Sequence, residues 1–412
     1  MSADPREPGW RREGTPAVSP RPSQRRISWD VLRVFAVFCV VVQHATNQGP
    51  ASHPELGPMP FRFSLQFGAS TLLVISAFFV CVTVRRHHPL QWWWGRIARL
   101  TPAYLVAVLV TFTILRLADV PGWYQPNEKD LWGNLLMLQS WLPEVHYVDG
   151  AYWTLPIQIM AFTAAALLWP TGWMRGWRVS ATLWTIVVAP LVLRTLRTDD
   201  APQLVRSLFD GLGLHRAHLF VAGVAIWLHS RGRMPSWHVA ALLLGVLVAQ
   251  EIHSQDLPST LAFGVMLLLV WLAAVGPDWR VGPLRHLNRP IVFLAGISYG
   301  MYLVNQEIGY VLARYLVELG VGPWGRLVVV LAAAVVNGWL LTRLVERPAH
   351  RWLTRGTSGG GGGQIQAGSS GRSPESPAPS PRPVSHASMS ATGPRTENRG
   401  VFGSLPLISQ LR

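Results

Sequence analysis

Apolar runs recur along the chain between residues 27 and 344, separated by polar connections that contain many arginines. A helix needs about 20 apolar residues to cross the hydrocarbon core of a bilayer, and several of these runs are shorter, so we expect some helix ends to extend into the interface. The pattern predicts an all-α, polytopic membrane bundle of about ten transmembrane helices. The expected spans are Ile27–Gln48, Phe67–Val84, Leu100–Leu115, Ala151–Trp169, Val179–Leu193, Ala217–Leu228, Trp237–Ile252, Thr260–Val275, Ile291–Leu312 and Leu327–Leu344.

The two ends of the chain have no such pattern. Residues 1–27 are rich in proline and arginine, and residues 356–412 are rich in glycine, serine and proline. Chains of this composition cannot bury enough apolar surface to fold. We therefore predict a transmembrane domain over residues 28–355, between two disordered tails.

Arginines are concentrated in alternate connections, which predicts the orientation of the bundle. Because cytoplasmic loops carry an excess of positive charge, these connections are expected to face the cytoplasm. Ten spans then place both tails in the cytoplasm and the protein in the cell membrane. The arginines that support this orientation are Arg85, Arg86, Arg96, Arg99, Arg175, Arg178, Arg231, Arg233, Arg280, Arg285, Arg289, Arg347, Arg351 and Arg355.

Composition narrows the class of protein. Only 14% of the 412 residues are charged, against about 25% in soluble domains. The net charge of +15 is spread over short clusters, so we predict a lipid bilayer and not nucleic acid as the partner of the basic residues. Cys39 and Cys81 lie in apolar runs and are expected to be free thiols. The sequence has no CxxC, HExxH or Walker-type motif, and we predict no metal site.

The first apolar run carries three ionisable residues, Asp30, Arg33 and His44. Arg33 and His44 are eleven positions apart, which is almost three helical turns and roughly 16 Å along the helix axis. Both side chains should therefore point to one face. Because ionisable groups are costly in hydrocarbon, we expect this face to line a polar cavity inside the bundle.

Several motifs together resemble the membrane-bound acyltransferase 3 family, whose members acylate hydroxyl groups of sugars and related molecules. Arg33, ten intervening residues and His44 match its R-x10-H pattern. RIARLTPAY resembles R-x-x-R-L-x-P-x-Y, with Arg96, Arg99 and Tyr104 in place. LVERP is similar to a terminal E-x-P element, with Glu346 matching. The resemblance extends from about residue 28 to residue 352.

Three positions depart from the family pattern. FGASTLLVISAFFV resembles a family segment that ends in S-G-F, with Ser76 and Phe78 matching. Ala77 stands where glycine is usual, a mild change because a small residue still allows close helix packing. Gln158, in YWTLPIQIMAF, replaces a glutamate, and glutamine cannot exchange a proton. Asn305 replaces the histidine that usually follows the S-Y-x-x-Y-L pattern. These departures leave open a family member that has lost activity.

The resemblance implies an enzyme that uses acyl-CoA as co-substrate and holds no permanent cofactor. It implies His44 and Arg33 as catalytic residues, with His44 as general base. Arg96, Arg99 and Tyr104 would bind the donor. The hydroxylated acceptor would be a glycan, a glycolipid or a small secreted metabolite such as a macrolide, and its expected binding residues are Asp30, Trp153, Gln158, Ser298, Tyr302, Asn305 and Glu307.

Simpler interpretations remain open for several of these residues. Arg96 and Arg99 also fit a cytoplasmic loop that only sets topology. Gln158 could only join helices, and Glu307 could lie at the outer interface. Glu346 could form an interfacial pair with Arg347. A transporter of a polar solute is the main alternative function for the whole chain.

Overall fold

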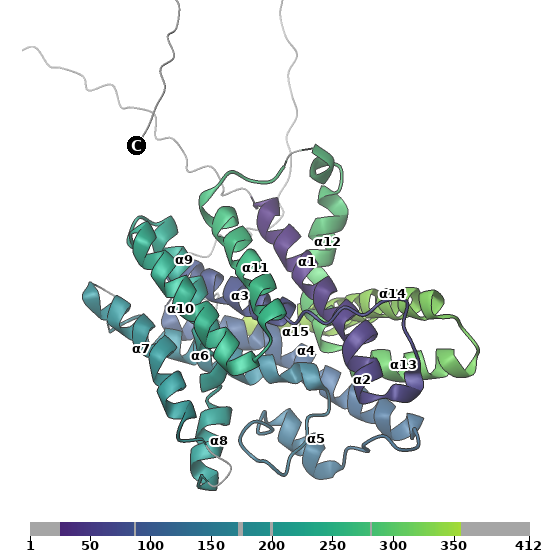
Figure 1. Cartoon of the computed structure of the whole chain (residues 1–412). Coiled ribbons are helices and arrows are strands. Elements are labelled where there is room, and N and C mark those ends of the chain that lie inside the picture. Colours follow the sequence, from purple (N-terminus) through teal and green to yellow (C-terminus); the bar gives the residue numbers. More distant parts are fainter. Residues whose placement is uncertain (1–24, 86–87, 172–175, 198–200, 281, 356–412) are drawn as a thin grey trace, which may run out of the picture. The chain divides into compact units, whose positions relative to one another are not determined.

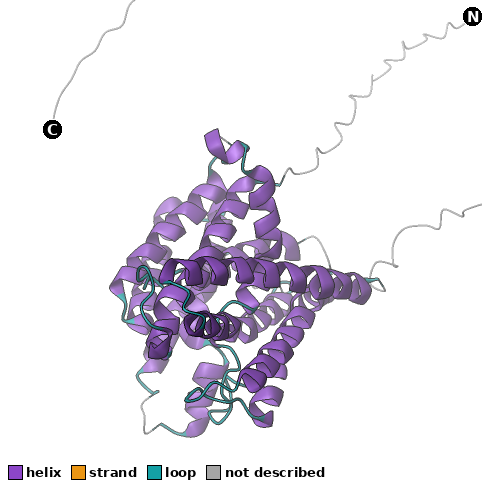
Figure 2. Ribbon diagram, turned by 90° about the vertical axis from the view of Figure 1, so that its right-hand side faces the viewer, coloured by secondary structure: helices purple, strands orange, loops and turns teal. Residues whose placement is uncertain are grey.

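The computed structural model describes residues 25–85, 88–171, 176–197, 201–280 and 282–355, and these residues form helices with no β-strand (Figure 2). The all-α prediction is therefore confirmed. Almost all of the predicted tail over residues 1–27, and all of the tail over 356–412, lies outside the described residues.

Each predicted apolar run contains helix, and the run 291–312 is divided between two helices. The helices are α1 (Ile27–Gln43), α3 (Gly68–Val84), α4 (Pro89–Ala118), α6 (Thr154–Leu168), α7 (Trp177–Arg194), α9 (Ala217–Ser230), α10 (Ser236–Ser254), α11 (Leu257–Val275), α12 (Asn288–Leu303), α13 (Glu307–Glu318) and α14 (Pro323–Leu341). Within the described ranges, eight helical segments are long and apolar enough to cross a membrane, and α3 is a shorter apolar helix. The expected count of about ten spans is not confirmed.

Shorter elements join these helices. Two π-helical turns follow long helices, η1 (His44–Gln48) after α1 and η6 (Thr342–Glu346) after α14. Four short α-helices lie in connections or at the end of the described bundle: α2 (Gly49–Ser52), α5 (Glu128–Leu135), α8 (Gln203–Gly211) and α15 (Arg347–Thr354). The 3-10 turns are η2 (Pro54–Leu56), η3 (Gly150–Trp153), η4 (Leu214–Arg216) and η5 (Gly282–Arg285).

The expected ninth span, Ile291–Leu312, is wrong as a single continuous helix. The chain leaves the helical path at residues 304–306, between α12 and α13. Asn305 lies in this break, and its side-chain amide donates a hydrogen bond to the carbonyl oxygen of Tyr302 at 2.7 Å. An asparagine side chain competes in this way with the backbone partners of a helix. The break is thus stabilised by the polar residue that interrupts the apolar run.

Small residues bring the central helices close together. A β-carbon at Gly68 of α3 would lie 2.5 Å from the carbonyl oxygen of Ala36 in α1. A β-carbon at Gly223 of α9 would lie 2.6 Å from the β-carbon of Ala77 in α3. The small residue expected at position 77 is therefore in the tightest part of the α3–α9 contact, as in membrane helix interfaces generally.

Helix α1 is central to the polar interior. It packs against α3, α11, α12 and α14, while α9 and α11 pack against α3, and α10 packs against α9 and α11 (Figure 1). Cys39 and Cys81 are free thiols, as expected. The packing of α1 on several sides provides the protein surroundings that its ionisable side chains require.

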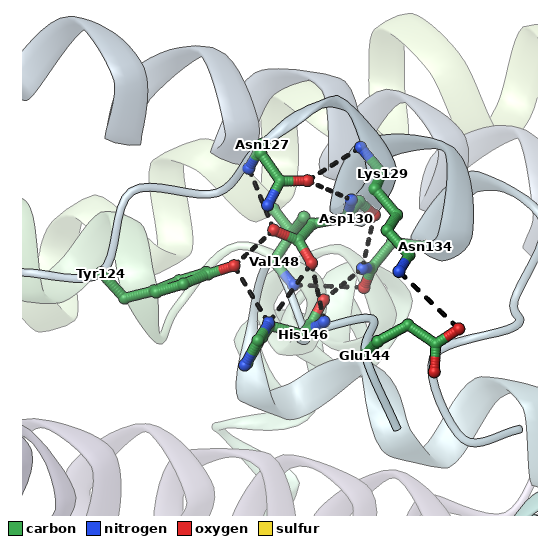
Figure 3. A network of polar contacts seen from close by, with 8 residues as sticks. All are labelled: Tyr124, Asn127, Lys129, Asp130, Asn134, Glu144, His146 and Val148. Atoms are coloured by element: carbon green, nitrogen blue, oxygen red, sulfur yellow. Dashed lines mark hydrogen bonds and ion pairs between the residues drawn. The ribbon is translucent and has the colours of Figure 1, made fainter. Parts of the chain in front are cut away.

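The connection between α4 and α6 folds around Asp130, the third residue of α5 (Figure 3). The Asp130 carboxylate accepts hydrogen bonds from the Tyr124 hydroxyl at 2.6 Å and from the backbone amides of Asn127 and His146 at 3.0 and 2.7 Å. Burial alone would raise the pKa of Asp130, but these hydrogen bonds outweigh it and hold the pKa below its ordinary value. Asn134 adds bonds to the backbone of His146 and Val148.

Candidate active site

Three arginines from two helices line one cavity, which we call the arginine cavity. Its volume is about 150 Å³. Arg33 comes from α1, and Arg96 and Arg99 come from consecutive turns of α4. The structure brings these arginines together with four predicted acceptor-binding or motif residues, Ser76, Gln158, Ser298 and Tyr302.

Arg33 is held by a carboxylate on its own helix. Its guanidinium lies 3.6 Å from the carboxylate of Asp30, one turn earlier, and 5.9 Å from the centre of the Phe79 ring. Asp30 is buried and also accepts two hydrogen bonds from Arg25, at 2.6 and 2.8 Å. Asp30 is not among the described residues that line the arginine cavity. Asp30 thus contacts Arg25 and Arg33, and its role in binding the acceptor stays a prediction.

Arg96 and Arg99 are anchored differently. Arg96 donates a hydrogen bond to the Thr83 hydroxyl at 2.7 Å and lies 5.6 Å from the centre of the Trp92 ring. Arg99 pairs with the buried carboxylate of Glu346 at 3.3 Å. The simpler interpretation of Glu346, an interfacial pair with Arg347, is not found among the described residues, because the carboxylate pairs with Arg99 of α4.

His44 occupies the first residue of the π-helical turn and makes a hydrogen bond of 2.7 Å with the side-chain oxygen of Asn305. The Asn305 amide nitrogen is already used on the carbonyl of Tyr302, so its oxygen faces the imidazole. An amide oxygen can only accept a hydrogen bond. His44 Nδ1 therefore carries the proton, and Nε2 keeps the lone pair that a general base needs.

A second cavity, the His44 cavity, adjoins the arginine cavity. It has a volume of about 270 Å³ and is lined by His44, Trp153 and Arg216 among others. Ala69 and Tyr302 line both cavities. The Tyr302 hydroxyl is fixed at this boundary because it donates to the carbonyl of Ala151 at 2.8 Å. The helical spacing predicts one polar cavity beside both residues, whereas the structure places Arg33 and His44 on two cavities that share the walls formed by Ala69 and Tyr302.

Comparison with known proteins identifies the family of the chain. The profile of a family described as an acyltransferase domain matches residues 26–343. The chain belongs to this acyltransferase 3 family. It is 24% identical over 365 residues to acyltransferase MdmB from Streptomyces mycarofaciens, an alignment that covers 79% of this chain and 91% of the relative. No solved structure matches. The resemblance that the sequence motifs indicate is confirmed, and the protein is an acyltransferase.

The remaining predicted site residues of the acyltransferase fall in different places. Gln158 accepts a hydrogen bond of 3.4 Å from Ser76, so two positions of the family motifs meet on the wall of the arginine cavity. Ser298 also lines it and donates to the carbonyl of Ala295. Tyr104 is fully buried, and its hydroxyl donates to the carbonyl of Asn134 at 2.6 Å. Tyr104 therefore lies in the protein core, and its donor-binding role stays a prediction.

Glu307 lies at the start of α13, directly after the helix break. Its backbone amide donates to the buried carboxylate of Asp149 at 3.1 Å, and Asp149 also accepts from the amide of Ala151 at 2.8 Å. The Glu307 carboxylate accepts from Gln306 at 3.2 Å. Asp149 therefore joins the connection before α6 to the helix break that carries Asn305.

Sequence reasoning missed one wall of the His44 cavity in the acyltransferase. The missed residues are polar, and several of them lie inside apolar helices: Gln43, Arg216, Gln250, His253, Asp256 and Ser259. Arg216 lies in the turn η4 directly before α9, and His253 lies in the last turn of α10. Each is just outside a predicted span, and nothing in the local sequence joins them to His44.

Proposed function

We propose that the acyltransferase is an integral membrane O-acyltransferase that moves an acyl group, acetyl or another short chain, from acyl-CoA to a hydroxyl of a carbohydrate or a glycosylated or secreted metabolite. The observation that carries the proposal is the pair of adjoining cavities, one lined by three arginines and the other by His44. The arginines of the first would bind the phosphates of the donor, and the reacting hydroxyl would lie beside His44 in the second.

The arginine cavity is the donor site in this proposal. Guanidinium groups bind phosphate oxygens through paired, charge-assisted hydrogen bonds. The phosphates of CoA would lie near Arg33, Arg96 and Arg99, on the side that we expect to face the cytoplasm. The pantetheine arm would pass Ala69 and Tyr302 and carry the thioester toward His44.

His44 is the general base of the proposed reaction. Its Nε2 removes the proton from the acceptor hydroxyl while the oxygen attacks the thioester carbonyl. When the tetrahedral intermediate collapses, the carbon–sulfur bond breaks and the thiolate of CoA takes the proton from the imidazolium. The products are the acyl ester and free CoA, and His44 returns to its neutral form. The scheme uses the side chains of the chain alone.

The proposal is tested with His44→Ala in the purified full-length protein. Removal of a general base lowers turnover by about 10²–10⁴-fold, so transfer from labelled acyl-CoA should fall by that factor. His286→Ala is the matched control, because His286 is exposed and is not among the described residues lining either cavity. Unchanged product formation in His44→Ala would remove His44 from catalysis. A wild-type protein that binds CoA but acylates no acceptor would indicate a family member without activity.

A further inference from the structure

A third polar cavity adjoins the His44 cavity. We call it the aromatic cleft. It has a volume of about 460 Å³ and is lined by three aromatic side chains, Trp141, Tyr147 and Trp153, together with polar residues of α8 and the 3-10 turn η4. Trp153 and Arg216 line both the aromatic cleft and the His44 cavity.

The position of Trp141 depends on a glycine in α8. A β-carbon at Gly211 would lie 2.3 Å from the Trp141 ring. The connection that carries Trp141 and Tyr147 is in turn folded around Asp130 (Figure 3). The aromatic side chains of the cleft are therefore held in place by packing against α8 and by the hydrogen bonds around Asp130. Aromatic faces beside polar side chains suit a hydroxylated ring, which has apolar C–H faces and polar edges.

Arg216 lies where the aromatic cleft meets the His44 cavity. Its guanidinium carbon is 5.1 Å from the centre of the Trp153 ring. Within the described part of the chain, Arg216 has no salt bridge, and its Nε is buried without a hydrogen-bond partner. A buried N–H without a partner is destabilising, and a guanidinium matches the geometry of a carboxylate or phosphate.

Among the described residues, the other two arginines of the cleft have side-chain partners and do not line the His44 cavity. Arg197 forms a salt bridge with Asp210 at 2.8 Å. Arg206 donates to the side chain of Gln203 at 3.2 Å, although its Nε, like that of Arg216, is buried without a partner in the described part of the chain. Arg216 is thus the cationic side chain of the cleft that is best placed to meet a ligand close to His44. A ligand bound to it would have its neighbouring hydroxyls near the imidazole.

We propose that the aromatic cleft is the acceptor site, and that the acceptor is a hydroxylated ring carrying an anionic group, a carboxylate or a phosphate, which binds Arg216. This inference rests on the proposed function, since it assigns the second substrate of the same reaction. The ring stacks among the aromatic side chains, the anionic group pairs with the guanidinium, and one hydroxyl reaches His44 Nε2.

The test measures binding of three small glycosides to the full-length protein in lipid nanodiscs, by saturation-transfer NMR. The probes are the methyl glycoside of glucuronic acid, glucose 1-phosphate and the neutral methyl glucoside. We expect at least one anionic probe to bind about tenfold or more tightly than the neutral one. The comparison of the two anionic probes distinguishes a carboxylate from a phosphate.

Variants of the protein test whether Arg216 causes the preference for an anionic glycoside. Arg216→Gln should remove it, and Arg216→Lys should retain part of it. Arg116→Gln should leave it unchanged, because Arg116 is exposed at the end of α4 and is not among the described residues lining the cleft. Binding of all three probes with equal strength, binding of none, or a preference that survives in Arg216→Gln would overturn the proposal.

A separate measurement on the same preparations distinguishes this inference from the proposed function. Labelled acyl-CoA binding and His44-dependent transfer report on the donor site and the chemistry, whereas the glycoside preference reports on the cleft. If Arg216→Gln lowers turnover equally for charged and neutral acceptors and leaves glycoside binding intact, Arg216 stabilises the transition state and the acceptor assignment is wrong. If the preference depends on Arg216 but transfer does not depend on His44, the cleft stands and the proposed mechanism fails.

Discussion

The imidazole of His44 donates a hydrogen bond to the side-chain oxygen of Asn305, across 2.7 Å and 261 positions of sequence. Asn305 stands at a family position where histidine is usual. Its amide nitrogen bonds to the carbonyl of Tyr302 in the broken helix. The departure from the family pattern therefore still provides a fixed acceptor for His44 Nδ1.

Removal of the Asn305 amide should lower turnover without abolishing donor binding. In Asn305→Ala the imidazole loses the partner that fixes its tautomer and ring orientation, and misplacement of a catalytic group by about 1 Å costs on the order of 10²-fold in rate. We expect kcat to fall by about 10- to 100-fold while the KM for acyl-CoA changes little. Asn305→His, which restores the family residue, should retain most activity. Equal kcat values in wild type and Asn305→Ala would contradict the positioning role.

Substitution of Arg96 or Arg99 should weaken donor binding only when the donor carries the phosphates of CoA. Arg96→Gln and Arg99→Gln are expected to raise the KM for acyl-CoA by about tenfold each, since charge-assisted hydrogen bonds are removed. The same substitutions should have little effect with an acyl-pantetheine donor, which lacks the 3′-phospho-ADP part of CoA. Steady-state kinetics with both donors measures the difference.

Arg289→Gln serves as the charge-matched control for this comparison. Arg289 is exposed near the start of α12 and is not among the described residues lining the arginine cavity. If Arg96→Gln weakens both donors equally, the arginine supports the fold or the topology, and the phosphate assignment is wrong.

Close packing of α12 against α14 should make one glycine intolerant of a side chain. A β-carbon at Gly300 would lie 2.4 Å from the carbonyl oxygen of Gly338. Overpacking of this kind destabilises by about 1–3 kcal/mol, so Gly300→Ala should lower the thermal midpoint. Gly95→Ala in α4 is the control, because a β-carbon there meets no described atom within 4 Å. A midpoint for Gly300→Ala at or above that of Gly95→Ala would show that α12 and α14 pack less closely.

Acid should weaken the framework around Asp130. The folded-state pKa of this carboxyl lies below its ordinary value of 3.8, so the unfolded state binds the proton more readily. The stabilisation is therefore fully present above the unfolded pKa and is lost as the pH falls through the folded pKa. We expect the thermal midpoint of the wild type to fall steeply below about pH 4, and that of Asp130→Asn to be lower at neutral pH and flatter in acid.

Asp119→Asn is the control for this pH dependence. Asp119 is an exposed residue of the same connection, so its substitution should leave the acid slope of the wild type unchanged. If Asp130→Asn keeps the wild-type slope, other carboxyls determine the acid sensitivity of the chain.

The amino-acid sequence by itself determined the helices and the order of the motifs. Apolar runs of this length in a membrane protein form helices because lipid offers no partners for backbone groups, and each predicted run except 291–312 contains one unbroken helix. The spacing of Arg33 and His44 along one helix likewise determined that both face the same side. These are local properties, read from neighbouring residues.

Only the tertiary structure decided which distant residues meet. The break at residues 304–306, the pairing of Arg99 with Glu346 and the position of Arg216 beside the His44 cavity depend on how helices pack. In a membrane, the outer face of a helix is as apolar as its packed face, so hydrophobic periodicity does not distinguish the two. The choice of partner for a polar side chain therefore comes from the assembled bundle, where a buried polar group must find a hydrogen-bond partner or leave a site for a ligand.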